Sequence, residues 1–106
     1  MYKPLPEFLT IKQSGIDGLG LFSKQDLEQG ANLGMSHLKI GDHIFRTPLG
    51  GFINHSNTPN CVKAELRMTN EDLKGNEYKY KKWNLIVSQD IKKGEELTVR
   101  YTFYHV

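Results

Sequence analysis

Apolar residues in this chain recur at every second position over short segments, and nowhere at the spacing of a helix face. Three segments show this alternation most clearly: residues 8–13, 61–69 and 81–91. In the last of them, Trp83, Leu85 and Val87 fall on one side of the expected strand. A period of two is typical of half-buried strands, whereas amphipathic helices repeat every three to four residues. The pattern therefore predicts a mostly β domain of many short strands.

Glycines and polar residues separate these segments. Gly15, Gly18 and Gly20 fall within six residues, which predicts a loop or tight turn. The other expected elements are a strand at 21–27 that turns at 28–30, short strands within 31–49, a polar loop at 70–79, a turn at 92–96 and a closing strand with a tail. No repeat or low-complexity tract interrupts this order.

Length and composition indicate one ordinary globular domain over residues 1–106, with an extended lead-in at 1–7 and a short tail at 102–106. The net charge of +2 is too small to argue for nucleic acid. Cys61 is the sole cysteine, which excludes an internal disulfide and a cysteine-rich zinc site within the chain. No apolar run approaches the roughly 18 residues of a membrane span. The first residues lack a signal-peptide pattern, so we expect an intracellular protein that is not secreted.

Three short motifs contain the residues that could bind a ligand or take part in catalysis. They are the turn Gly18-Leu19-Gly20, the polar stretch at 54–60 and "GEELTVRY" at 94–101. Each is weak alone. A Gly-x-Gly turn without a following helix is no dinucleotide fingerprint, and Asn-His-Ser with Pro-Asn can be plain turn chemistry.

Taken in this order, the three motifs resemble the SET-domain family of protein-lysine methyltransferases. "INHSNTPN" matches the family's Asn-His-Ser-x-x-Pro-Asn element, and "GEELTVRY" matches its closing element. The resemblance covers residues 14–103 and is to minimal viral and bacterial members that lack flanking zinc regions. It implies a β-clip fold of short strands in several small sheets. It also implies a C-terminal segment that threads under a preceding loop in a knot-like arrangement.

The resemblance further implies that S-adenosylmethionine is the cofactor and that no metal is needed. The methionine end of S-adenosylmethionine would contact the backbone of Gly18, Leu19 and Gly20, because glycines let a ligand approach the backbone closely. Asn54 and His55 would meet the same cofactor, the histidine chiefly through its backbone. An amide side chain offers both donors and acceptors, which suits a zwitterionic amino-acid group.

Tyr101 occupies the position of the family's catalytic tyrosine, so its hydroxyl would lie beside the cofactor and the transferring methyl group. Phe103 and Tyr104 would wall the channel of a protein or peptide substrate that presents a lysine. That amine must be neutral to attack, yet with an ordinary pKa of about 10.4 only roughly one lysine in a thousand is neutral at pH 7. Catalysis is then mainly positioning and oriented dipoles.

The chain departs from the family pattern at several positions. Gly51 stands where an arginine is common, and the segment at 33–52 leaves a short substrate wall. Lys63 and Val99 stand near strand positions where many relatives place channel aromatics, and we expect the Lys63 ammonium to extend away. These departures leave open a catalytically inactive module that binds a peptide or protein partner. They also leave open a homodimer in which each chain completes the other's site. A nucleic-acid-binding module is a more distant alternative.

The remaining polar residues have plainer interpretations. We interpret His37, His43 and His105 as surface or turn residues, and Cys61 as a buried small hydrophobe. Glu95 and Glu96 are expected to serve the turn through hydrogen bonds rather than as an acid pair. The cluster of Lys79, Lys81 and Lys82 beside Tyr78 and Tyr80 is typical of a solvated strand face.

Overall fold

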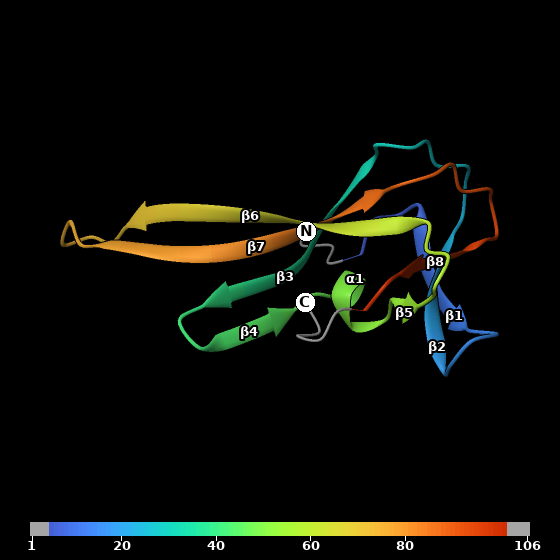
Figure 1. Cartoon of the computed structure of the whole chain (residues 1–106), viewed down its shortest axis with the longest axis horizontal. Coiled ribbons are helices and arrows are strands. Elements are labelled where there is room, and N and C mark those ends of the chain that lie inside the picture. Colours follow the sequence, from blue (N-terminus) through green and yellow to red (C-terminus); the bar gives the residue numbers. More distant parts are fainter. Residues whose placement is uncertain (1–4, 102–106) are drawn as a thin grey trace.

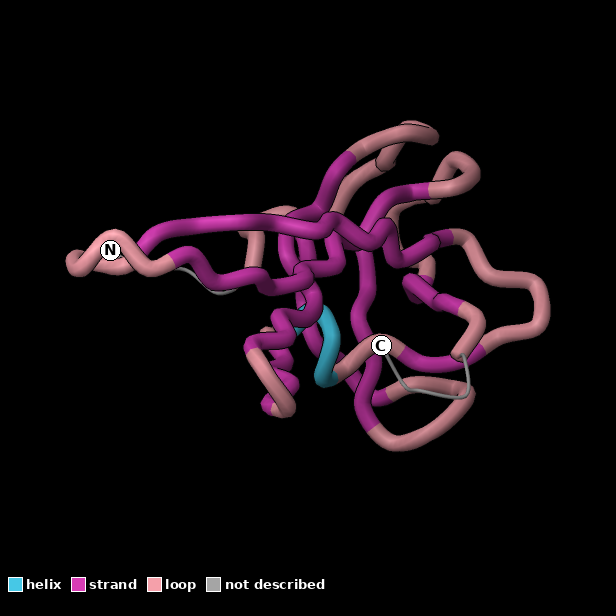
Figure 2. Tube along the Cα trace, turned by 60° about the vertical axis from the view of Figure 1, so that its left-hand side comes forward, coloured by secondary structure: helices cyan, strands magenta, loops and turns pink. Residues whose placement is uncertain are grey.

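The computed structural model describes residues 5–101, and its strands form two four-stranded sheets (Figure 1). In spatial order, the first sheet contains β1 (Leu9–Gln13), β2 (Leu19–Ser23), β8 (Glu96–Val99) and β5 (Asn54–His55). The second contains β4 (His43–Arg46), β3 (Asn32–Ile40), β7 (Glu77–Val87) and β6 (Cys61–Glu71). Figure 2 shows how much of the traced chain is strand. The expectation of a mostly β fold in small sheets is confirmed.

Both sheets contribute to one hydrophobic core. Its buried members are Leu9, Leu21, Leu27, Leu33, Leu49, Ile53, Cys61, Leu85, Val87, Ile91, Leu97 and Val99. The side chains of Trp83, Leu85 and Val87 are all buried, so the face predicted for this strand is confirmed. Burial also raises the pKa of the Cys61 thiol to about 12, as expected for a cysteine that acts as a small hydrophobe.

The hairpin of β6 and β7 projects from the body of the molecule (Figure 1). The two strands pair without interruption as far as Glu71 and Glu77. The tip is closed by Asp72, whose Oδ1 accepts two backbone N–H groups, and by Gly75 at φ 80°. The predicted loop at 70–79 was therefore too long, because the cross-strand ladder continues through polar residues.

A short helix, α1 (Pro48–Gly51), follows β4 and was not predicted. Pro48 suits a first helical position because its missing N–H would have no partner there. Leu49 is buried, and a Cβ at Gly50 would collide with Ser36 and His37. Four residues are too few to give a helical period, and the strands predicted within 31–49 overlap only its first two residues.

His37 is 2% exposed, which corrects its interpretation as a surface or turn residue. It pairs in β3 with Trp83 of β7 and Arg46 of β4, so strands cover it on both sides. Its ring meets that of Trp83 edge-on, with centroids 6.4 Å apart. His43 is exposed, as expected.

Phe103, Tyr104 and His105 lie outside the described residues, so the predicted channel wall and the threading of the last segment stay predictions. Between residues 5 and 101, no helix is long and apolar enough to cross a membrane. The same described part holds no group of three or more His, Cys, Asp or Glu side chains suited to a metal ion.

Candidate functional site

β8 brings the three sequence motifs together. It pairs in parallel with β5, which places Asn54 beside Thr98 and His55 beside Val99. On its other side, β8 pairs with β2, the strand that begins within the glycine turn. Segments more than 40 residues apart in the sequence therefore lie on adjacent strands of the first sheet (Figure 1).

The Asn54 side chain joins the glycine turn to β8. Its Nδ2 lies 3.1 Å from the carbonyl oxygen of Asp17, 3.2 Å from that of Leu19 and 2.8 Å from Oε2 of Glu96. The residue is only 9% exposed. Two amide hydrogens are thus shared among three acceptors on two elements, which fixes the turn relative to the strand.

Glu96 is the second half of this connection. Its carboxylate accepts a hydrogen bond from Ser14 Oγ, 2.8 Å from both oxygens. A Cβ at Gly20 would collide with this carboxylate and lie 3.1 Å from Asn54 Nδ2, so a larger residue would displace the Glu96 side chain from these hydrogen bonds. Gly18 instead has φ 44°, a conformation that favours glycine. The expectation that Glu96 serves hydrogen bonding is confirmed, but its link to Asn54 was not foreseen.

Asn60 fixes β8 from the other motif. Its Nδ2 donates to the Glu96 carbonyl at 2.9 Å, and its Oδ1 accepts the Thr98 N–H at 2.8 Å. The side chain is 8% exposed. Sequence reasoning gave Asn60 only a turn role. The one signal in the sequence is the position of this asparagine between a proline and an alternating strand.

Tyr101 is held at both its hydroxyl and its backbone. The hydroxyl donates to the carbonyl of Ile53 at 2.6 Å, and the backbone N–H donates to Nδ1 of His55 at 2.8 Å. Nε2 of His55 lies 3.1 Å from Oδ1 of Asn57. Because Nδ1 accepts, the ring proton belongs on Nε2. The His55 imidazole therefore positions Tyr101, a role that the sequence did not reveal.

The surroundings of Tyr101 keep its hydroxyl protonated. Partial burial raises its pKa above the ordinary value, the charge of Asp17 adds to this rise, and Arg46 opposes it. The residue is still 45% exposed, so the ring remains accessible. The phenol can act as a neutral donor or dipole at ordinary pH, and it is a poor base.

Lys63 extends toward this tyrosine. Its Nζ lies 5.9 Å from the centre of the Tyr101 ring. The side chain is half-buried, and desolvation lowers its pKa. The expectation that the ammonium extends away was wrong, because the side chain packs over an aromatic ring where a cation is attracted to the π face.

The backbone of the glycine turn is open, which the predicted contact with the methionine end of S-adenosylmethionine would require. No heavy atom lies within 4 Å of a Cβ built at Gly15 or Gly18, so a ligand can approach the backbone there. Ile16 and Leu19 are 54% and 53% exposed and offer apolar surface beside the open turn. These residues fit such a group. The predicted contacts of Gly18, Leu19, Gly20, Asn54 and His55 with the cofactor stay predictions.

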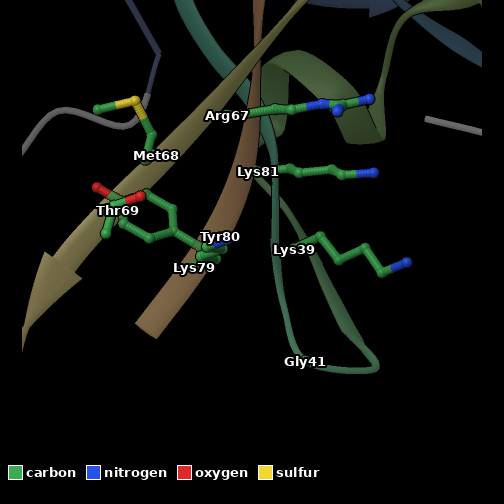
Figure 3. Close-up of a pocket in the computed structure, with 8 residues that line it drawn as sticks. All are labelled: Lys39, Gly41, Arg67, Met68, Thr69, Lys79, Tyr80 and Lys81. Atoms are coloured by element: carbon green, nitrogen blue, oxygen red, sulfur yellow. The ribbon is translucent and has the colours of Figure 1, made fainter. Parts of the chain in front are cut away.

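A separate groove of about 520 Å³ lies on the second sheet (Figure 3). Its lining residues are Lys39, Gly41, Arg67, Met68, Thr69, Lys79, Tyr80 and Lys81. The side chains of Lys39, Lys81 and Arg67 extend to the same side (Figure 3), because the three residues are direct neighbours across three strands. None of the three motifs contributes to this groove, so we do not assign it to the candidate site.

The family model described as the SET domain matches residues 35–102, which is more than half of the chain. The chain therefore belongs to the SET-domain family. The resemblance carried by the three motifs is confirmed at the level of the family, while the minimal subtype stays a prediction.

Among curated proteins, the chain is similar to histone-lysine N-methyltransferase 2D of Homo sapiens and of Mus musculus. Each is 30% identical over 123 aligned positions, which cover 88% of this chain. The chain spans 2% of the length of these relatives.

Among solved structures, the chain is similar to the crystal structure of a proposed histone methyltransferase from Plasmodium falciparum. The TM-score is 0.64 at 14% identity, and the match covers 93% of this chain and 96% of the other. The likeness in fold therefore extends over nearly the whole of both chains.

Proposed function

We propose that this chain is an S-adenosylmethionine-dependent protein-lysine N-methyltransferase. The observation that carries the proposal is the hydrogen-bonded connection from the glycine turn through Asn54 and Glu96 to β8, and from His55 to Tyr101. This connection joins the three motifs into one site. Membership of the SET-domain family and similarity to proteins named histone-lysine N-methyltransferases support the same activity.

When bound, S-adenosylmethionine supplies a sulfonium methyl group that needs no further activation. The residues of the chain then have to hold and align the reactants. The backbone at Gly18 and Leu19 would bind the amino-acid end of the cofactor, with Asn54 keeping the turn in place. His55 and Ile53 orient the Tyr101 ring, whose phenol dipole would face the reacting amine.

The partner that suits this site is a protein or peptide with an accessible lysine. Its amine has to lose a proton before attack, and an environment of low polarity assists because it disfavours the ammonium form. Phe103 and Tyr104, which follow Tyr101 directly in the chain, are proposed to supply such an environment. The Tyr101 hydroxyl would serve as a positioning dipole and not as the base, consistent with its raised pKa.

A second candidate is a binding module without methyl transfer. It is favoured by an uncovered groove of about 320 Å³ on the second sheet. Its lining is mostly apolar and aromatic: Met35, Leu38, Ile40, Tyr78, Tyr80 and Lys82. In that case a peptide or a second copy of the chain would bind this face of the second sheet, and the three motifs would no longer serve catalysis.

Titration with S-adenosylhomocysteine and the substitution Tyr101→Phe separate the two functions. If the chain is an enzyme, we expect the wild type and Tyr101→Phe each to bind S-adenosylhomocysteine at one saturable site. We expect methyl transfer to lysine peptides to fall about a hundredfold in Tyr101→Phe, since loss of one oriented dipole has an effect of that order. Tyr78→Phe, in the projecting hairpin, is the matched control and should keep full transfer. Undiminished transfer in Tyr101→Phe would refute its role, and absence of cofactor binding would favour the module.

A further inference from the structure

Lys63 is the lysine of this chain that lies beside the proposed catalytic tyrosine. It stands in β6 opposite Leu85 of β7, within the part of the hairpin that joins the body of the molecule. Its Nζ reaches to 5.9 Å from the centre of the Tyr101 ring. A substrate lysine has to place its amine in this same neighbourhood, next to the phenol.

No carboxylate among the described residues forms an ion pair with Lys63, and its Nζ lies over the Tyr101 ring. Burial lowers its pKa, which raises the fraction of neutral amine. A structural lysine usually has a carboxylate partner or extends into solvent. Lys63 instead is half-buried, with its ammonium over the Tyr101 ring.

We propose that Lys63 is a methyl acceptor of its own chain, so that the protein modifies itself at the site of transfer. The inference rests on the proposed function and adds to it a modification site. Because the β6–β7 ladder holds the backbone of Lys63, the acceptor is already positioned and its reaction is intramolecular.

The step balances without a further reagent beyond a sulfonium methyl donor. The neutral Nζ of Lys63 attacks the methyl carbon, a C–N bond forms, and the C–S bond breaks with its electron pair going to sulfur. The sulfonium becomes a neutral thioether, and the methylated ammonium releases its proton to water. The methylated side chain is bulkier beside Tyr101, so added substrate would then compete less well for the site.

The test is incubation of the purified full chain with S-adenosylmethionine, followed by peptide mapping of methylated lysines by mass spectrometry. We expect a methyl group on Lys63, formed at a first-order rate that does not change with protein concentration. Lys63→Arg should abolish the modification, and Tyr101→Phe should slow it about a hundredfold with Lys63 still present. Lys79→Arg is the matched control, because Lys79 lies in the same hairpin, opposite Thr69 in its exposed outer part, and belongs to none of the three motifs.

Unmodified Lys63 at saturating methyl donor would overturn the inference, as would a rate that rises with protein concentration. Parallel assays with lysine peptides and with S-adenosylhomocysteine show which idea has failed. Transfer to peptides with Lys63 unmodified would refute self-methylation and leave the proposed function standing. Absence of transfer together with absence of cofactor binding would refute both.

Discussion

At the scale of single residues, His37 makes the fold sensitive to acid. Burial lowers its pKa from 6.5 to about 4, and the charges of Lys63 and Arg46 add to this effect. Its Nδ1 lies 3.0 Å from Ser36 Oγ, and Gly50 packs against its ring. A neutral imidazole fits this position, whereas an imidazolium would be desolvated beside two cations.

We predict that the free energy of unfolding falls as pH drops from 6.5 to about 4. The unfolded chain takes up a proton on His37 near 6.5 and the folded chain only near 4, so the stabilisation is complete above this window and is lost within it. At about 1.4 kcal/mol per pKa unit, the loss is about 3 kcal/mol. Urea unfolding at neutral pH and near pH 4 measures it.

The matched variants for this prediction are His37→Gln and His43→Gln. His37→Gln should be less stable at neutral pH but should lose less stability on acidification. His43 is exposed in β4, so His43→Gln should keep the wild-type pH dependence. An unchanged pH dependence in His37→Gln would assign the acid sensitivity to other groups.

At the scale of elements, β8 depends on side chains from outside its sheet ladder. It has only four residues, and Asn60 satisfies backbone groups of both Glu96 and Thr98. We predict that Asn60→Ala lowers the free energy of unfolding by about 2–3 kcal/mol, because it leaves buried backbone groups without partners. Chemical denaturation measures the loss. Asn70→Ala, on the exposed outer part of β6, is the control and should change stability by less than about 0.5 kcal/mol.

The elements themselves were largely readable from the sequence, and their long-range contacts were not. Alternation predicted strands at 61–69 and 81–91, since burial of one face leaves a local pattern. The structure confirms both strands with shifted ends, β6 at Cys61–Glu71 and β7 at Glu77–Val87. The burial of His37 leaves no such local pattern, because this burial depends on the pairing of β3 with β4 and β7. The same holds for Asn54 and Glu96, which are 42 residues apart and meet only through the parallel pairing of β5 with β8. Motif resemblance identified Asn54 and Tyr101 but could not show what holds them.

At the scale of the whole molecule, the candidate site and the outer hairpin are separate regions. The motifs gather around β8 and the buried core, whereas the outer parts of β6 and β7 are mostly exposed. Lys39, Lys81 and Arg67 align directly across three strands there. Like charges in such positions oppose one another, so this surface is not arranged for maximal stability. We infer that the core folds without the hairpin's outer part.

This inference can be tested by shortening the hairpin. A chain without residues 68–71 and 77–80 joins Arg67 to Asp72 and Asn76 to Lys81, and it keeps the closing turn. In an antiparallel ladder, hydrogen-bonded and non-hydrogen-bonded residue pairs alternate. Removing an even number of pairs, here four, therefore leaves next to the turn a pair of the same type as before. None of the deleted residues is fully buried. We therefore expect the free energy of unfolding to change by less than about 1 kcal/mol, and S-adenosylhomocysteine affinity to stay unchanged. A shortened chain that fails to fold would make the outer hairpin part of the folding unit. A shortened chain that folds but no longer binds would instead connect the hairpin to the site.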